Sequence, residues 1–412
     1  MARICIIRQG NFPLDPRVRR EADALISAGH TVDIICLRKP GLPLFERDGR
    51  LSIRRLPLAK RRSSTARYIF EYLTFLSAAM VLSSVLHLRH RYDLIQVNSI
   101  PDFLVFAALG PRLLGCPVLL DLHECMPEFF GTKFQTGLRH PVVRVIAWLE
   151  QISIRFASYA ITCTDQMRDV FVTRGTPPEK IEVILNGSDE EVFDATRFPQ
   201  RGREPGRFVL VCHGTVEERY GLDTIIRAVA LLKDEIPGLR LEIIGEGSFL
   251  EELRQLARDL GVEREVAFSG KFLPMEELLR AIASADAGVV AMKRDPFRDI
   301  TLCNKMFDFI AMRKPALVSR TRSVEEYFDD TCFQMFRSDD EHDLAQAIRE
   351  LHADPARGER LVQRAVQVSE AYRWPSQRER YRAIVERLIR PSTGDVSKTI
   401  GLHAQSGPHR HG

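Results

Sequence analysis

The sequence lacks the cysteine patterns that indicate a zinc or redox centre. Its 412 residues include eight cysteines, but these lie far apart and no two form a CxxC pair. Several occupy apolar, strand-like stretches, such as Cys5 in RICIIR and Cys36 in VDIICL. A free cysteine in such a place packs as a small hydrophobic residue, and reduced thiols are typical of cytosolic proteins. We therefore expect buried, reduced thiols in a cytoplasmic protein.

The sequence also lacks a large excess of one charge and a secretory leader. Its 59 basic and 55 acidic side chains leave a net charge of +4, so the composition does not call for nucleic acid as a partner. The first residues, MARICIIRQG, read as a strand and do not show the basic and then apolar segments of a signal peptide. We therefore expect a protein that is not secreted.

A dinucleotide-binding signature is missing after the first strand. The pattern GxGxxG lets a pyrophosphate approach bare backbone, but the stretch RQGNFPLD contains only Gly10. This disfavours a nicotinamide- or flavin-dependent dehydrogenase. Gly10 and Asn11 leave room for a sugar or a phosphate to approach the backbone, and a plain tight turn is the alternative.

Apolar runs rich in branched residues alternate with helical patterns, once in the first 190 residues or so and again from FVLVCHG at residue 208. Such alternation predicts parallel strands joined by crossover helices. The intervening stretch RFPQRGREPGR, residues 197–207, is polar and typical of a linker. The predicted fold class is α/β, with two doubly wound, Rossmann-like domains, 1–196 and 208–372, facing across a cleft.

The last residues predict a returning helix and a tail. YRWPSQRERYRAIVERLI has a helical pattern that is interrupted at Trp374 and Pro375, and a proline there breaks or redirects a helix. We expect residues 373–390 to cross back and pack on the first domain. Residues 391–412 lack apolar periodicity and are expected to be disordered.

One apolar stretch, residues 68–88, is long enough to cross a bilayer, which takes about 20 residues. It contains Glu71 and falls where the fold needs a crossover helix. We expect a domain helix preceded by a basic loop, residues 60–67, that touches anionic lipid headgroups at the inner face of the cytoplasmic membrane. A core helix with a solvated basic loop is the alternative.

Ligands of doubly wound sheets bind beyond the carboxyl ends of the strands. In the first half, His123 and Glu124 follow the apolar strand VLLDL, and Glu128 lies one turn further on. A histidine that faces a cleft can donate to a sugar hydroxyl or carry a proton. A purely structural histidine is the alternative.

In the second half, the polar residues that follow strands suit a phosphate group. HGTVEERYG places Arg219 after one strand, and NKMFD places Asn304 and Lys305 at a helix start with Asp308 one turn later. Helix-start amides and a lysine favour an anion, and the carboxylate can accept two hydrogen bonds from a diol such as ribose. A surface ion pair between Lys305 and Asp308 is the alternative.

The order of several motifs resembles the retaining glycosyltransferases of family 4. These motifs include DLHE, NGSDEEVF, HGTVEERYGLDTIIRA, IIGEGS and NKMFDFIAMRKP, and the resemblance extends from about residue 3 to residue 388. It implies the two-domain GT-B fold. It also implies a nucleotide-diphosphate sugar held mainly by the C-terminal domain, an acceptor held mainly by the N-terminal domain, and no metal cofactor.

The resemblance implies a role for each matching residue. Arg219 and Lys305 would neutralise the donor diphosphate, Asp308 would bind ribose, and His123 would lie near the donor sugar. Glu124 and Glu128 are expected on the acceptor side. The further donor contacts expected are Gly10, Asn11, Gly214, Glu246, Gly247 and Asn304.

Two positions depart from the family's pattern. Many members have a glutamate eight residues before the ribose acid, where this chain has Ile300 beside Asp299. The turn that commonly reads GRLxxxKG is GTVEERYG here. Thr215 therefore holds the usual arginine position, and Arg219 supplies the charge from one residue before the usual lysine.

The function that we expect is the retaining transfer of a hexosyl or acetylhexosaminyl group, with UDP favoured over GDP as the donor nucleotide. The acceptor would be a glycan or a lipid-linked molecule of polysaccharide or glycoconjugate synthesis. A GT-B epimerase or hydrolase is one alternative, and a non-catalytic partner that binds sugar nucleotides is the other.

Overall fold

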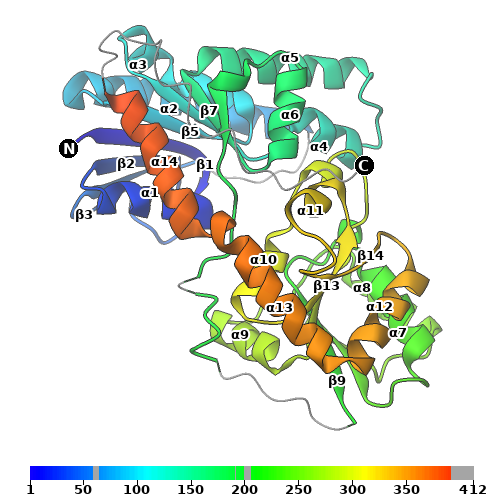
Figure 1. Cartoon of the computed structure of the whole chain (residues 1–412). Helices are drawn as coiled ribbons and strands as arrows, with labels where there is room; N and C mark the ends of the chain where they lie inside the picture. Colours follow the sequence, from blue (N-terminus) through cyan, green and yellow to red (C-terminus); the bar gives the residue numbers. More distant parts are fainter. Residues whose placement is uncertain (59–64, 191, 199–205, 391–412) are drawn as a thin grey trace, which may run out of the picture.

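The computed structural model describes residues 1–58, 65–190, 192–198 and 206–390, which form two α/β domains (Figure 1). Most of the expected basic loop, most of the expected linker and the whole expected tail therefore lie outside the described residues. The predicted fold class is confirmed, because each domain contains a sheet of mainly parallel strands covered by helices. All eight cysteines are free, and seven of them are buried.

The first domain is built on an eight-stranded sheet in the order β3-β4-β2-β1-β5-β6-β7-β8, in which only β3 runs antiparallel to its neighbour. Its strands are β1 (Arg3–Asn11), β2 (Thr31–Leu37), β3 (Phe45–Asp48), β4 (Leu51–Leu56), β5 (Leu94–Asn98), β6 (Val118–Leu122), β7 (Tyr159–Thr162) and β8 (Ile181–Val183). Its helices are α1 (Pro16–Ser27), α2 (Thr65–His90), η1 (Asp102–Ala108), α3 (Leu109–Leu113), α4 (Met126–Lys133), α5 (Pro141–Phe156), α6 (Asp165–Thr173) and η2 (Pro178–Lys180).

The second domain is built on a six-stranded parallel sheet in the order β11-β10-β9-β12-β13-β14. Its strands are β9 (Phe208–His213), β10 (Leu239–Ile244), β11 (Val266–Phe268), β12 (Ala287–Val290), β13 (Ala316–Arg320) and β14 (Gln334–Arg337). Its helices are η3 (Glu218–Tyr220), α7 (Leu222–Leu232), α8 (Leu250–Asp259), α9 (Met275–Ser284), η4 (Arg298–Ile300), α10 (Asn304–Ala311), α11 (Arg322–Tyr327), α12 (Glu341–Ala353) and α13 (Pro355–Ser369).

The last described helix lies on the first domain. After η5 (Glu370–Tyr372), the helix α14 (Trp374–Ile389) crosses back and lies beside α1 (Figure 1). Tyr381, Ile384 and Val385 of α14 are buried in the same apolar cluster as α1 and the inner strands. The expected return of residues 373–390 is therefore present in the structure.

Two hydrophobic layers hold the first sheet. One face packs against α1 and α14, and the other packs against α2, η1, α5 and α6. At α1 the local signals are clear, because Asp15 caps the first turn by accepting from the Arg17 amide at 3.2 Å and Pro16 occupies the first helical position. This cap fixes the loop that leads from β1 toward the cleft.

Candidate active site

Lys305 and Arg219 lie near the same aromatic ring, which belongs to Tyr220 in the second domain. The Lys305 Nζ lies 3.8 Å from the centroid of the Tyr220 ring, and the Arg219 Cζ lies 5.2 Å from it. An aromatic face attracts cations at such distances. The structure therefore brings together the two cations that the sequence indicated for a diphosphate.

Gly214 lies directly against the side chain of Lys305. Its φ is 103°, a conformation that favours glycine. A Cβ atom on this residue would lie only 2.7 Å from the Lys305 Cε. Gly214 is therefore needed both for its backbone conformation and for the space that it leaves to the lysine.

Lys305 stands in the first turn of α10, next to backbone amides that can receive an anion. Asn304, the first residue of the helix, is exposed, and Cys303 precedes it as the N-cap residue without contributing a side-chain cap. The first amides of a helix have no partner inside the helix and carry its positive dipole end. These amides and Lys305 together place positive charge at the start of α10.

Asp308 lies one turn further along α10 and is nearly enclosed. Its Oδ1 accepts a hydrogen bond from the Ser188 hydroxyl at 2.6 Å, and its Oδ2 lies 3.7 Å from the His213 Nε2. Burial raises the pKa of Asp308 to about 7. Burial and the charge of Lys305 lower the pKa of His213 to about 3. His213 is therefore neutral near pH 7 and does not form an ion pair with Asp308.

The turn after β10 packs directly on the turn after β9. A Cβ on Gly247 would lie 2.0 Å from the Val216 carbonyl oxygen, and the Glu246 carbonyl accepts a hydrogen bond from the Val216 amide at 2.9 Å. Gly247, expected as a donor contact, is therefore needed for the close approach of the Val216 backbone, which fills the space beside its Cα. The Glu246 side chain is exposed.

His123 stands at the end of β6, as expected, but its ring is buried between protein groups. Its Nε2 lies 2.7 Å from the Asp121 Oδ2, and its Nδ1 contacts the Arg17 guanidinium. Burial lowers the pKa of His123, although Asp121 opposes this. A neutral ring with these partners accepts from Arg17 at Nδ1 and donates to Asp121 at Nε2. Both nitrogens are thus engaged, which corrects the expectation of a side chain ready to donate to a sugar hydroxyl.

A buried polar network extends behind His123. Asn98 donates to Asp121 at 2.6 Å and to Glu21 at 2.9 Å, and Gln96 donates to Glu21 at 2.7 Å. The Tyr381 hydroxyl donates to the Gln96 Oε1 at 2.5 Å. The returning helix α14 is therefore connected to the His123 side chain through hydrogen-bonded groups of α1, β5 and β6.

The two glutamates after β6 have different environments. Glu124 lies where the domains meet: burial raises its pKa, and the positive charges of Arg17, Arg219 and Arg8 oppose this rise. Glu128 is buried and pairs with Arg174 at the end of α6. Glu128 therefore serves the packing of α4 against α6, which corrects its expected place on the acceptor side.

The end of β1 borders a cavity of the first domain. Asn11 lines a cavity of about 620 Å³ together with Leu37 and Arg38. A Cβ on Gly10 would meet only the Arg8 side chain, at an ordinary 3.5 Å. A larger side chain would therefore fit at position 10. Of Gly10 and Asn11, Asn11 is the residue that lines the cavity.

Arg17 and Arg298 are two site residues that the sequence reasoning missed. Arg298 of η4 contacts Asp295, and its pKa is lowered to about 10 by burial and by the nearby charge of Arg219. Arg17 holds the His123 ring. The signal for Arg17 was present in the sequence, because it follows the capping residue of a helix that begins at the first strand's end. Arg298 has no such signal.

Ile300, which occupies the place of the family's first glutamate, joins the two domains. It is 4% exposed and belongs to the apolar cluster of the first domain, although it lies in the second. Its carbonyl accepts a hydrogen bond from the Thr164 hydroxyl at 2.7 Å, and the Phe297 ring packs edge-on to Phe129 with centroids 5.4 Å apart. At this position the chain has an apolar interdomain contact.

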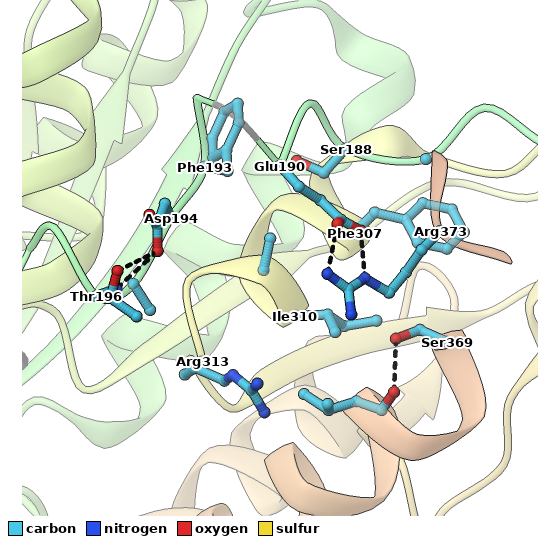
Figure 2. A pocket seen from close by; sticks show the side chains of 14 residues that line it. Ser188, Glu190, Phe193, Asp194, Thr196, Phe307, Ile310, Arg313, Ser369 and Arg373 are labelled. Carbon is cyan, nitrogen blue, oxygen red and sulfur yellow. Dashed lines mark hydrogen bonds and ion pairs between the residues drawn. The ribbon is translucent and has the colours of Figure 1, made fainter. Parts of the chain in front are cut away.

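A separate cavity of about 250 Å³ lies next to Ser188, between the segment 187–196, α10 and α13 (Figure 2). Glu190 and Arg373 form a double ion pair at its edge, with distances of 2.6 and 2.5 Å. No predicted site residue is among the described residues that line it.

Metal ligands do not cluster in the described part of the chain. Within residues 1–58, 65–190, 192–198 and 206–390, no group of three or more His, Cys, Asp or Glu side chains is placed to hold a metal ion.

Two family models match most of the chain. The model described as glycosyl transferase 4-like domain matches residues 14–187, and the model described as glycosyl transferases group 1 matches residues 207–354. Their boundary coincides with the passage from the first sheet to the second.

Curated relatives match parts of the chain. A glycogen synthase of Mycobacterium tuberculosis is 30% identical over 61% of this chain and 58% of its own length. A GDP-mannose-dependent alpha-(1-6)-phosphatidylinositol monomannoside mannosyltransferase of Mycolicibacterium smegmatis is 36% identical over 29% of this chain and 32% of its own length. The matches thus span about a third to somewhat over half of these relatives.

Solved structures match almost the whole chain. The sucrose-phosphate synthase of Thermosynechococcus elongatus superposes with a TM-score of 0.72 at 18% identity, covering 94% of this chain and 99% of that one. HepE of Anabaena, solved in complex with UDP-glucose, superposes with a TM-score of 0.66 at 15% identity, covering 94% and 100%. At such identities the likeness concerns the fold.

Proposed function

The chain belongs to the GT-B glycosyltransferases of the family 4 kind, and from this premise we propose that it moves a sugar from a nucleotide-diphosphate sugar to a glycan or lipid-linked acceptor with retention of configuration. The sugar is a hexose or an acetylhexosamine. The donor is a UDP-sugar. A GDP-sugar is the alternative, and the mannosyltransferase relative is named for such a donor.

The gathering of Lys305 and Arg219 around Tyr220, next to the first amides of α10, carries the proposal. As the bond between the sugar and the diphosphate breaks, negative charge grows on the leaving phosphate. Positive groups fixed in advance stabilise that charge more than they stabilise the ground state. Lys305 and Arg219 therefore act on the leaving group, without a metal cofactor.

The remaining groups position the two substrates. Asp308 accepts the ribose hydroxyls in place of its present bond to Ser188. The acceptor oxygen attacks the anomeric carbon on the side that the diphosphate leaves, and a phosphate oxygen takes the acceptor proton. Glu124, beside cations of both domains, orients the acceptor. His123, held by Arg17 and Asp121, shapes the pocket wall near the sugar.

A second candidate function is the non-catalytic binding of sugar nucleotides. It is favoured by Ile300, because an apolar interdomain contact cannot hydrogen-bond a donor sugar as a glutamate can. An epimerase or hydrolase has less support. It needs carboxylates that move protons, and of the two acidic residues after β6, Glu128 is occupied by Arg174.

The test is a thermal-shift screen with UDP- and GDP-sugars, followed by turnover measurements with the donor that binds. A specific ligand raises the melting temperature according to its occupancy. Arg219→Ala and Lys305→Ala should each weaken donor binding and turnover at least tenfold, while Arg280→Ala on the exposed face of α9 should change neither. Wild-type binding in both site variants would reject the proposed donor site, and binding without any transfer or hydrolysis would favour the non-catalytic function.

We also propose that the protein works in the cytoplasm at the inner face of the membrane, where lipid-linked acceptors are available. The basic loop at 60–67 was the first reason for this proposal, and its residues 60–64 lie outside the described residues. The described helix α2, which follows this loop, supplies independent support.

A further inference from the structure

Helix α2 exposes most of an apolar surface that a core helix would bury. Its segment Ile69–His90, with a mean hydropathy of 1.7, is long and apolar enough to cross a membrane. Only 28% of its most apolar window is buried. Phe70, Leu73 and Val81 are 62%, 50% and 62% exposed. These residues follow one another at helical spacing, so they form one outward stripe.

The opposite face of α2 excludes a transmembrane role for the helix. Tyr72, Phe75, Ala79 and Leu86 are buried, and three of them join the apolar cluster on the first sheet. A helix that crossed a bilayer would leave these partners uncovered. The outward stripe therefore has to be explained on the surface of a folded domain.

The neighbouring helices extend the stripe into a broad face. Helix α2 packs against η1 and α3, and α5 also packs against η1. These helices lie on the same side of the sheet, where α2, α3 and α5 can be followed in Figure 1. Leu113 of α3 and Trp148 of α5 are 78% and 61% exposed. Among the described residues, most exposed large hydrophobic side chains lie between Ile69 and Trp148. We call this layer the α2–α3–α5 face.

The exposed charges of this face are basic. Arg89, Arg144 and Arg155 are exposed on α2 and α5. The two acidic residues of these helices are neutralised, because Glu71 pairs with Arg67 and Glu150 is buried against Arg174. An apolar surface surrounded by basic side chains complements the interface of an anionic membrane.

Three neighbouring cavities, which we together call the groove, lie between this face and the carboxyl end of β1. A cavity of about 780 Å³ along α2 shares Phe70 and Thr74 with a smaller one of about 90 Å³. The smaller cavity shares Leu37 and Leu58 with the cavity of about 620 Å³ that reaches Asn11. The groove thus begins among apolar side chains of α2 and ends at the carboxyl end of β1.

The polarity of the groove changes along its length. Its outer part is lined by apolar residues such as Leu73, Val81 and Val85. The middle cavity is lined by the ion pair of Arg67 and Glu71, and the inner cavity by the exposed cation of Arg38. Such a path fits an amphipathic molecule with its hydrocarbon chain on α2 and its anionic head next to the carboxyl end of β1.

We propose that the groove binds the hydrocarbon chain of an anionic, lipid-linked acceptor, and that the α2–α3–α5 face rests on the membrane that supplies this acceptor. The proposal rests on the proposed function, since it names the acceptor of that reaction. It places the acceptor head at Asn11 and Arg38, beside the carboxyl end of β1.

Membrane docking is tested with vesicles of phosphatidylglycerol and phosphatidylcholine, and with vesicles of phosphatidylcholine alone. Trp374→Phe leaves Trp148 as the single tryptophan, and its emission should move to shorter wavelength and be quenched by brominated acyl chains. Leu73→Glu with Val81→Glu should reduce flotation with the anionic vesicles at least tenfold. The control Leu231→Glu, an exposed leucine of α7 in the second domain, should float as the wild type does.

The groove is tested separately with dodecyl phosphate below its micellar concentration, measured by titration calorimetry. The wild type should bind it at least tenfold more tightly than inorganic phosphate. Ala78→Phe, which fills the groove beside Val81 without adding charge, should remove this difference and keep flotation. Equal binding of the two phosphates would reject the groove, and unchanged flotation of the double glutamate variant would reject the docking face.

These outcomes are distinct from a failure of the proposed function. Donor binding is measured on the soluble protein with nucleotide sugars and does not depend on α2. A protein that floats and binds dodecyl phosphate but no nucleotide sugar would reject the donor site and leave the membrane face standing. A protein that binds nucleotide sugars but neither floats nor binds dodecyl phosphate would be a transferase with a water-soluble acceptor, and the membrane face and the groove would be rejected.

Discussion

At the scale of single residues, Asp308 links donor binding to pH. Its burial raises the folded-state pKa to about 7, so the side chain is mainly protonated at pH 6 and ionised at pH 8. Only the carboxylate accepts from both hydroxyls of a ribose. We therefore expect the affinity for a UDP-sugar to rise from pH 6 to pH 8, measured by calorimetry, and Asp308→Asn to lower the affinity at pH 8 and to flatten this dependence. An equal slope in both proteins would contradict the role.

The same pKa has the opposite effect on the stability of the free protein. An ordinary aspartate titrates near 3.9, so between about pH 4 and pH 7 the folded protein binds more protons at Asp308 than the unfolded chain does. The contribution of Asp308 to stability therefore falls as pH rises through this window. Urea unfolding of the wild type and Asp308→Asn at several pH values tests this. The free energy of unfolding of the wild type, relative to that of the variant, should fall as the pH rises toward 7.

Gly214 offers a second residue-scale prediction. Gly214→Ala should weaken donor binding as Lys305→Ala does, because the new Cβ would lie 2.7 Å from the Lys305 Cε and displace it. Gly115→Ala is the matched control: its φ is also positive, at 88°, but nothing lies within 4 Å of the place that its Cβ would take. The control should cost only the strain of a positive φ, about 1–2 kcal/mol, and leave donor affinity unchanged. Equal donor affinity in the two variants would contradict the steric role of Gly214.

At the scale of elements, the segment around η4 makes an interdomain contact through Ile300, at the position where many family members have a glutamate. Ile300→Glu restores the family's residue type but puts a carboxylate into the apolar cluster of the first domain. Burial of an unpaired charge is unfavourable, so we expect a lower melting temperature and no gain in turnover. Ile300→Val, which removes one methyl group, should cost only about 1 kcal/mol. A stable and more active Ile300→Glu would show that the segment can open.

The sequence predicted those elements whose pattern is local. The strand β9 and the helix α2 were evident from apolar periodicity. The strand β3 was not, because all four of its residues are exposed and show no apolar pattern. Between β5 and β6 the chain forms η1 and the short helix α3 in place of one long helix, and Pro111, which lacks an amide hydrogen, lies in the first turn of α3.

The same distinction applies to the candidate site. Lys305 and Arg219 meet as expected because each follows a strand at the same sheet edge. The partners that enclose Glu128 and Gly247 could not be inferred, since Arg174 and Val216 come from other elements and have no spacing in common with them. Arg17 lies at a helix start that the sequence indicated, but its spacing gave no sign of its contact with His123. The roles of the donor residues in catalysis stay predictions until they are measured.

At the scale of the whole molecule, α14 joins the two domains. It follows the second domain in the chain but is buried on the first, where the Tyr381 hydroxyl donates to Gln96. Tyr381→Phe would leave the buried Gln96 oxygen without this donor, and an unsatisfied buried acceptor costs about 1–3 kcal/mol. We expect urea unfolding to show such a loss, with unchanged affinity for the donor nucleotide, because the cations around Tyr220 lie in the second domain.

The matched control for this prediction is Tyr372→Phe, on η5 just before α14. Tyr372 contacts its neighbours through edge-to-face ring packing, with centroids 5.3 Å from Tyr327 and 5.9 Å from Phe328, so the loss of its hydroxyl should cost less than about 0.5 kcal/mol. If Tyr381→Phe were as harmless as this control, the network from α14 to His123 would not hold the domain. If it weakened donor binding without changing stability, the network would instead transmit the position of α14 to the cleft.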